Sequence, residues 1–238
     1  MCTLTFVAVE NKFIITHNRD EQTLRPCAIE PKKYLINNKN ILFPKDSKAG
    51  GTWFTVSERG AVLVLLNGAI EKHEHKSNYR KSRGLIVLDL ITATSVNNAW
   101  CSIDLENIEP FTTILFENFK LYHLQWNGVE KCTTPLNINE PYIWSSSTLY
   151  PKEIRNQRQQ WFTNFLKNNA DLHENKLLAF HQNTQNADSD NGLVINRNNH
   201  IKTLSITQTV IENGTTVTRY LDLIANKKFK CSQVNSII

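Results

Sequence analysis

Two stretches near the start of the chain decide its fold: Cys2-Thr-Leu-Thr-Phe-Val-Ala-Val9 and Phe13-Ile-Ile-Thr-His-Asn-Arg19. Both are rich in β-branched and aromatic residues, and the first alternates in polarity near its start, as strands do. The residues between them, Glu10-Asn-Lys12, are typical of a turn. The sequence therefore predicts an N-terminal β-hairpin.

Later segments alternate between strand and helix patterns. Residues 22–48 contain Pro26, Pro31 and Pro44 and are expected to be irregular. Strands are expected at 53–56, 61–66, 111–116, 120–126, 192–196, 203–211 and 216–223, and helices at 84–97, 151–167 and 174–181. This order of strands and helices predicts stacked sheets covered by helices in one domain, residues 1–238.

Composition excludes several classes of protein. The chain has 238 residues, of which 40% are hydrophobic and 21% charged, enough apolar surface for a sizeable core. No apolar run nears the roughly 18 residues that a transmembrane helix needs. The net charge of +5 is mild, and no basic stripe is interleaved with aromatic residues, so nucleic-acid binding is not expected.

The cysteines favour a reduced, cytoplasmic protein. There are five, widely spaced and without a C-x-x-C pair, which argues against a structural zinc site. No basic segment followed by an apolar one begins the sequence, so a cleaved secretion signal is not expected. His73 and His75 form a candidate metal pair, but with no third ligand nearby in the sequence no metal site is predicted.

Cys2 directly follows the initiator methionine and is the main candidate for chemistry. Removal of Met1 would leave Cys2 with a free α-amine, whose pKa of about 8 leaves a useful fraction neutral at cellular pH. Such an amine can act as general base for the thiol of the same residue. An ordinary buried strand cysteine is the competing interpretation.

The hairpin places other polar residues relative to Cys2. If Asn11 and Lys12 form the turn, Cys2 faces Glu21 and Arg19 is its diagonal neighbour on the same face, roughly 7–8 Å away. A guanidinium there would lower the thiol pKa and could position an anionic substrate group. A one-residue change in the turn would put Asp20 on that face instead. A charged strand end running into solvent is the alternative.

Asn67-Gly68 ends a buried strand. It is a strong turn signal, but the Asn67 amide could also stabilise the developing negative charge of an oxyanion.

One combination of motifs is far more specific than any single piece. It joins Met1-Cys2, Asn18-Arg-Asp-Glu21, Ala49-Gly-Gly-Thr-Trp53, Leu66-Asn67 and Lys81-Ser-Arg-Gly84. This combination resembles the NRDE family, also called the transport and Golgi organisation 2 (TANGO2-like) family. The family is similar to the N-terminal nucleophile (Ntn) hydrolases, whose nearest groups are the choloylglycine hydrolases and acyltransferases.

The resemblance implies an α+β fold, a four-layer αββα sandwich of the Ntn-hydrolase type. Matched by motif, it implies Cys2 as the nucleophile, Arg19 and Asp20 beside it, and Asn67 in the oxyanion hole. No metal and no cofactor are predicted.

Two positions depart from the family pattern. Ser146 stands where relatives tend to carry a second Asn, and Lys202 stands where they often carry Arg, which changes the geometry of hydrogen bonding.

Two functions follow as expectations. The first is a cysteine amidohydrolase or acyltransferase that cleaves a non-peptide C–N or acyl bond of a small molecule. The second is a weakly active or inactive scaffold that binds or traffics a ligand such as haem, a lipid or acyl-CoA.

Overall fold

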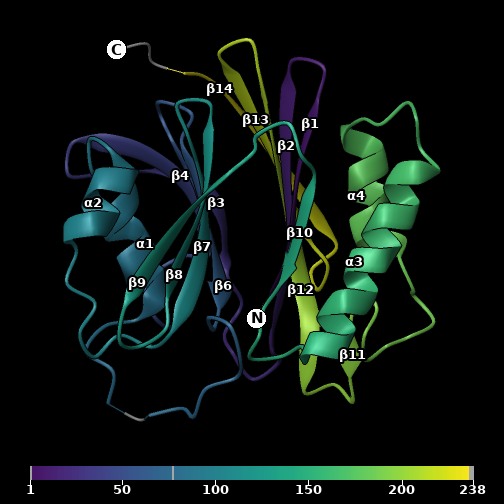
Figure 1. Ribbon diagram of the computed structural model, residues 1–238, viewed down its shortest axis with the longest axis horizontal. Helices are drawn as coiled ribbons and strands as arrows, with labels where there is room; N and C mark the ends of the chain where they lie inside the picture. The colour runs from purple at the N-terminus through teal and green to yellow at the C-terminus, as the bar shows by residue number, and fades with distance from the viewer. Residues whose placement is uncertain (1, 77, 236–238) are drawn as a thin grey trace. The chain divides into compact units, whose positions relative to one another are not determined.

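The computed structural model describes residues 2–76 and 78–235, and the chain divides into two compact units (Figure 1). Unit 1 comprises the described residues up to Arg25 together with Asn139–Gln233, and unit 2 comprises Pro26–Ile138 with Val234 and Asn235. The single domain predicted over residues 1–238 stays a prediction.

Unit 1 is built on a seven-stranded sheet. The order is β10-β1-β2-β12-β13-β14, and β11 also pairs with β12. The strands are β1 (Cys2–Val9), β2 (Lys12–Gln22), β10 (Tyr142–Ser145), β11 (Asn196–Arg197), β12 (Ile201–Glu212), β13 (Thr215–Asp222) and β14 (Lys227–Val234). The predicted hairpin of β1 and β2 is therefore central, because β10 flanks it on one side and β12 on the other.

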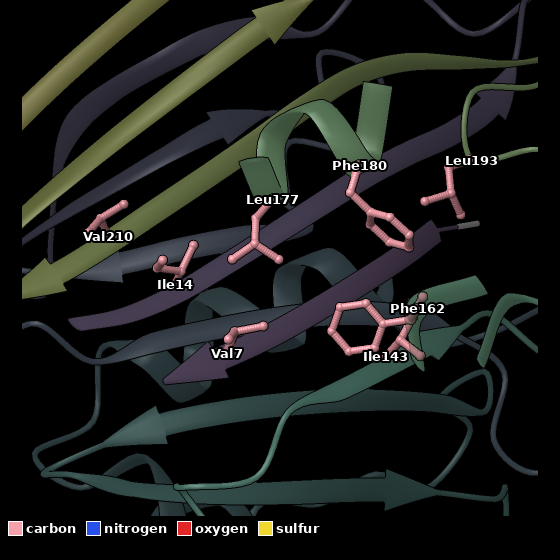
Figure 2. Packing of buried hydrophobic residues seen from close by; sticks show 8 residues of the cluster. All are labelled: Val7, Ile14, Ile143, Phe162, Leu177, Phe180, Leu193 and Val210. Atoms are coloured by element: carbon pink, nitrogen blue, oxygen red, sulfur yellow. The ribbon is translucent and has the colours of Figure 1, made fainter. Parts of the chain in front are cut away.

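Helices α3 (Lys152–Lys167) and α4 (Glu174–Asn183) cover one face of this sheet (Figure 1). Figure 2 shows the apolar cluster that joins them to the strands, made of Val7, Ile14, Ile143, Phe162, Leu177, Phe180, Leu193 and Val210. Side chains alternate along a strand, so this cluster identifies which residues of β1 and β2 lie on the helix side.

Unit 2 is built on a seven-stranded meander in chain order. Its strands are β3 (Ile29–Ile36), β4 (Lys39–Lys45), β5 (Phe54–Ser57), β6 (Val62–Asn67), β7 (Phe111–Glu117), β8 (Lys120–Trp126) and β9 (Lys131–Leu136). Helix α1 (Arg83–Ile91) packs on β5 and β6, and α2 (Val96–Ser102) packs on β7. Side chains along β6 are buried on both faces up to Leu66, as its continuous apolar sequence predicts.

The glycines of the Ala49-Gly-Gly-Thr-Trp53 and Lys81-Ser-Arg-Gly84 motifs have a packing role. A Cβ atom on Gly51 would lie 2.4 Å from the carbonyl carbon of Gly84, and the Thr52 amide donates to the Gly84 carbonyl at 3.1 Å. Only residues without a side chain allow these two backbones to approach so closely. The pair fixes the start of α1 against the loop before β5.

The predicted hairpin register is wrong by two residues. The turn lies at Glu10 and Asn11, and Cys2 pairs directly with Arg19 rather than with Glu21. A shift of two residues preserves the face on which each side chain lies. Arg19 is thus still on the face of Cys2, but as its immediate neighbour.

Other differences from the predicted elements have local causes. Residues 22–48 were expected to be irregular, yet they contain β3 and β4; Pro31 is tolerated because β3 is an edge strand with an irregular register at that point. The single helix expected at 84–97 is broken into α1 and α2, because the Thr92 hydroxyl caps the first and Ser95 begins the second. Strands β9, β10 and β14 were not predicted.

Candidate active site

Cys2, Arg19 and Ser205 form a row across three strands of unit 1. Cys2 pairs with Arg19 across β1 and β2, and Arg19 pairs with Ser205 across β2 and β12. Directly opposite residues have Cβ atoms about 5 Å apart. Cys2 is 3% exposed and Arg19 4%. Since Val7 packs against the helices, Cys2, five residues earlier, lies on the opposite face of β1.

The backbone nitrogen of Cys2 has a defined partner. It donates to the Ser146 hydroxyl at 2.9 Å, and the Ser146 amide donates to the Cys2 carbonyl at 2.9 Å. Ser146 directly follows β10 and is buried. The position that departs from the family pattern is therefore in direct contact with the nitrogen that removal of Met1 would convert into an amine; Met1 itself lies outside the described residues.

Burial raises the pKa of the Cys2 thiol. The carboxylate of Asp20 raises that pKa further, whereas the Arg19 guanidinium lowers it. At neutral pH Cys2 is therefore a protonated thiol rather than a thiolate.

Arg19 is part of a charged group at the end of β2. Its Nη2 lies 3.8 Å from the Glu21 carboxylate, and the same carboxylate lies 3.9 Å from Nε of Arg25. Two guanidinium groups thus share one carboxylate at this end of the strand.

Asp20 lies on the other face of the sheet, the face covered by helices. Its carboxylate accepts hydrogen bonds from the Tyr150 hydroxyl and from the Thr203 hydroxyl, each at 2.6 Å. The pairing of β2 with β12 is irregular at this point, where Thr203 pairs with Asp20 and Ser205 pairs with Arg19. β2 itself continues its alternation.

Opposing effects act on the ionisation of Asp20. Burial raises its pKa, whereas the Arg158 guanidinium and the hydrogen bonds from Thr203 and Tyr150 lower it. The pKa of Tyr150 is itself raised well above its ordinary value by burial and by Asp20. Tyr150 therefore stays protonated and donates to Asp20.

Arg158 is a fully buried cation in α3. Its guanidinium carbon lies 3.6 Å from the centre of the Tyr150 ring, a cation–π geometry. It donates to the Thr3 hydroxyl, to the Ser145 hydroxyl at 3.4 Å, and to the Asn191 and Gly192 carbonyls at 3.0 and 2.6 Å. Carbonyl and hydroxyl oxygens thus replace water around the charge.

His181 of α4 completes the polar layer under β1 and β2. Its Nδ1 lies 2.7 Å from the Asn18 side-chain oxygen and its Nε2 lies 2.8 Å from the Thr5 hydroxyl. The Asn18 amide nitrogen already donates to two carbonyls, so its oxygen accepts and Nδ1 carries the proton. Burial, with the positive charge of Arg158, lowers the His181 pKa to about 3, so the ring is neutral.

Asn67 lies in unit 2, as the last residue of β6 and opposite Phe111. Gly68 follows with a φ of +82°, its amide donates to the Pro110 carbonyl, and its carbonyl accepts from the Thr112 hydroxyl. The tight turn predicted at Asn67-Gly68 is therefore not present: Asn67 still belongs to β6, and the chain bends only from Ala69 onward. The oxyanion role of Asn67 stays a prediction.

His73 and His75 both contact a carboxylate. His73 Nε2 and His75 Nδ1 lie 3.1 and 3.3 Å from one oxygen of Glu109, whose other oxygen pairs with Arg83 at 3.0 Å. Within residues 2–76 and 78–235, no group of three or more His, Cys, Asp or Glu side chains could hold a metal ion. Over those same residues, no helix is long and apolar enough to cross a membrane.

Sequence reasoning found Cys2 and Arg19 together but missed the residues that surround them. Tyr150, Arg158 and Thr203 lie far from Cys2 and Arg19 in the sequence and match no motif for catalysis. One signal was available for Arg158: it lies on the buried face of α3, four residues before the core residue Phe162. A charged residue at such a position indicates a buried polar network.

The family model described as "Transport and Golgi organisation 2" matches residues 1–230. No curated protein matches the sequence. Among solved structures, a Caenorhabditis elegans N-acylethanolamine-hydrolyzing acid amidase (NAAA) ortholog is similar at a TM-score of 0.63 and 11% identity, over 87% of this chain and 92% of that one.

Two structures of the conjugated bile acid hydrolase from Clostridium perfringens are also similar. The mutant C2A has a TM-score of 0.51 at 11% identity, over 98% of this chain and 93% of that one. An arginine-to-leucine variant has a TM-score of 0.55 at 10% identity, over 97% and 92%. Identities this low show the fold alone. That fold is the αββα Ntn-hydrolase class, so the predicted fold class is confirmed.

Proposed function

This chain belongs to the Transport and Golgi organisation 2 family, and from that premise we propose that it is a cysteine amidohydrolase of the Ntn type. The substrate is a small molecule with a non-peptide amide or acyl bond, and Cys2 is the nucleophile after loss of Met1. The similar solved structures include an acid amidase and a bile acid hydrolase, which supports hydrolysis of this general kind.

One observation carries the proposal. The Cys2 nitrogen is held by the buried Ser146 hydroxyl at 2.9 Å while the Cys2 side chain lies directly opposite the buried Arg19. An N-terminal nucleophile needs its nitrogen fixed relative to its own thiol, because that nitrogen is the general base. A strand cysteine with only a packing role has no need of a buried cation beside it, and burying charge is costly.

In the first half of the reaction the thiol transfers its proton to the α-amine of Cys2. The sulfur then forms a bond to the carbonyl carbon of the substrate, and the π electrons of the carbonyl move to its oxygen. The family resemblance assigns the stabilisation of this oxyanion to Asn67. Collapse of the intermediate breaks the C–N bond, and the leaving amine takes the proton from the α-ammonium group.

In the second half water releases the acyl group. Water attacks the thioester carbon and gives a proton to the α-amine, the C–S bond breaks, and the thiolate recovers that proton as the carboxylic acid leaves. Arg19 lowers the thiol pKa and attracts an anionic substrate group. Asp20 orients the amine electrostatically from the opposite face of the sheet.

The decisive experiment is peptide-mapped mass spectrometry after brief, limiting alkylation near pH 6. It reports whether Met1 is gone and which cysteine reacts first. Cys27, Cys101 and Cys132 are exposed and serve as internal standards for ordinary thiols. We expect the N-terminal peptide to begin at Cys2 and to be labelled ahead of these three.

Turnover is then measured on N-acylethanolamines and conjugated bile acids with wild type, Cys2→Ala and Asn67→Ala. Loss of activity in Cys2→Ala supports the proposal, and full turnover by that variant refutes it. Retention of Met1 in the native protein also refutes it, because the amine base would be absent.

Burial of Cys2 with a raised pKa favours a second candidate, a scaffold that binds or traffics haem, a lipid or acyl-CoA without cutting it. Under this alternative Met1 is lost but Cys2 reacts no faster than the exposed cysteines. Spectral titration with haem tests one version, since a saturable shift at micromolar ligand is required.

A further inference from the structure

Arg158 touches the strand ends that carry the nucleophile. Its guanidinium donates to the hydroxyls of Thr3 in β1 and Ser145 in β10, two residues that pair directly. Thr3 follows Cys2, and Ser145 precedes Ser146. One side chain therefore links the two strands at the residues next to the Cys2–Ser146 hydrogen bond.

The same guanidinium also supports the carboxylate of Asp20. It stacks on the Tyr150 ring at 3.6 Å, and the hydroxyl of that ring donates to Asp20 at 2.6 Å. The Tyr150 amide donates to the Ser146 carbonyl at 3.0 Å, so the turn that begins at Ser146 places the ring. Arg158, Tyr150 and Ser146 thus form one continuous set of contacts.

A packing role alone does not account for Arg158. A buried cation costs several kcal/mol to desolvate, and an apolar side chain of similar volume in this helix would avoid that cost. Phe162, one turn later in α3, fills the same interface with an apolar ring. What the guanidinium adds is a fixed fork of donors that reaches several acceptors at once.

We propose, resting on the proposed function of Cys2, that Arg158 is a positioning residue for the reaction. It fixes the junction of β1 and β10 that holds the Cys2 nitrogen, and through Tyr150 it fixes the carboxylate of Asp20. It touches neither the thiol nor the substrate.

The test uses Arg158→Lys and Tyr150→Phe in the full chain. Arg158→Lys keeps the charge but loses the fork, and Tyr150→Phe keeps the ring but loses the donor to Asp20. We expect both to lower kcat roughly tenfold or more with little change in KM, since a misplaced nucleophile slows the chemical step. Arg197→Lys is the matched control, because Arg197 lies near the same ring at 5.4 Å but donates to the loop at Asp190.

A second readout needs no substrate. The rate of Cys2 alkylation is measured against pH with Cys27 as internal standard. From the helix side Tyr150, Arg158 and Thr203 face Asp20, and on the other sheet face Arg19 faces Cys2. Without the Tyr150 donor the Asp20 carboxylate, whose charge raises the Cys2 pKa, is no longer held in its place, so the midpoint of Cys2 alkylation shifts from its wild-type pH.

The outcomes separate the two proposals. A variant that only loosened the structure would label faster at every pH without moving the midpoint, and that result, or a wild-type profile in both variants, overturns the role of Arg158. If wild type has no turnover but the midpoint shifts, the proposed function fails while the network stands. If Arg158→Lys does not fold, Thr3→Val removes its contact to β1 and must lower kcat in the same way.

Discussion

Each unit is a seven-stranded sheet with two helices packed on it, but the side chains buried under those helices differ in polarity. In unit 2 the buried residues of α1 and α2 are all apolar: Ile86, Val87, Leu88, Leu90, Ile91, Val96 and Trp100. In unit 1, α3 buries Arg158 beside Phe162, and α4 buries His181 beside Leu177 and Phe180. The strands under them add buried Asn18 and Asp20.

This difference shows that the helix–sheet interface of unit 1 depends on polar contacts and that of unit 2 on apolar packing. An apolar interface like that of unit 2 is the simpler way to attach helices to a sheet. Unit 1 combines an apolar cluster and a hydrogen-bonded polar layer on the same helix-covered face of its sheet. The comparison predicts that the unfolding free energy of unit 1 is sensitive to pH and to the removal of buried hydroxyl groups. That of unit 2 should be most sensitive to substitutions that change side-chain volume.

The largest effect is expected at His181. Its pKa is about 3 in the folded chain and about 6.5 when unfolded, so between these values only the unfolded chain binds the proton. Stability is therefore complete above pH 6.5 and falls as the pH drops toward 3, by up to roughly 5 kcal/mol. In His181→Gln that acid loss should be largely absent, as measured by urea unfolding at a series of pH values.

His123 of unit 2 is the control for this experiment. Burial lowers its pKa too, but it is only half-buried in β8 and has the smaller shift. His123→Gln should change the pH profile less than His181→Gln does. Equal profiles would contradict the contrast between the units.

The next effect is expected at Gly51 in unit 2. A methyl group there meets the Gly84 backbone at 2.4 Å, and neither backbone can move without displacing α1. Gly51→Ala should cost about 3 kcal/mol of unfolding free energy. Gly50→Ala has open space around its Cβ and only the strain of its φ of +72°, so about 1 kcal/mol is expected. Thermal unfolding of the two variants compares them, and a smaller loss at Gly51 would be inconsistent with the close approach.

Two buried threonines give a matched comparison of polar groups. The Thr203 hydroxyl donates to Asp20 and accepts from the Ile195 amide, so Thr203→Val should cost about 2 kcal/mol by leaving both unsatisfied. Within the part of the chain that the structure describes, the buried Thr113 hydroxyl of unit 2 has no hydrogen-bond partner. Thr113→Val should be neutral or stabilising. The midpoints of denaturant unfolding of the two variants test this difference. Equal losses of stability would contradict it.

The smallest effect concerns helix caps in unit 2. The Ser95 hydroxyl accepts from the Asn98 amide at the start of α2, so Ser95→Ala should cost about 1 kcal/mol. Ser82 occupies the same position before α1, but its side chain makes no capping bond, so Ser82→Ala should change stability by much less. Chemical unfolding of the two variants gives the comparison, and a larger loss for Ser82→Ala would show the assignment to be wrong.

Local patterns predicted the parts of the fold that depend on neighbours in the sequence. The β1–β2 hairpin, the strand at 61–66 and the helix at 151–167 follow from alternation and from helical spacing. The register of the hairpin could not be predicted, because Glu10 adopts a positive φ that its residue type does not favour. Pro31 concealed β3, because the edge position that tolerates it is a property of the whole sheet.

In the candidate site, too, the sequence predicted the residues that are close in the sequence and missed those that are distant. Cys2 and Arg19 lie on adjacent strands of one hairpin, so alternation alone put them on one face. Tyr150, Arg158 and Thr203 reach Asp20 from segments more than a hundred residues away in the sequence, and nothing local marks them. The departure at Ser146 was visible, but its contact with the Cys2 nitrogen required the pairing of β1 with β10.

The irregularity in β12 is a β-bulge, and it shifts the alternation of side chains between the two faces of the sheet. Leu204 is an extra residue between the pairs Thr203–Asp20 and Ser205–Arg19, so side-chain alternation on its two sides is out of step by one. Because of this offset Thr203 and Ser205, which are two residues apart, lie on opposite faces: the Thr203 hydroxyl donates to Asp20 on the helix side and Ser205 lies beside Arg19 on the other face. Deleting Leu204 would leave these two pairs in place and make the pairing of β12 with β2 regular, so the extra residue is not what brings either side chain to its partner.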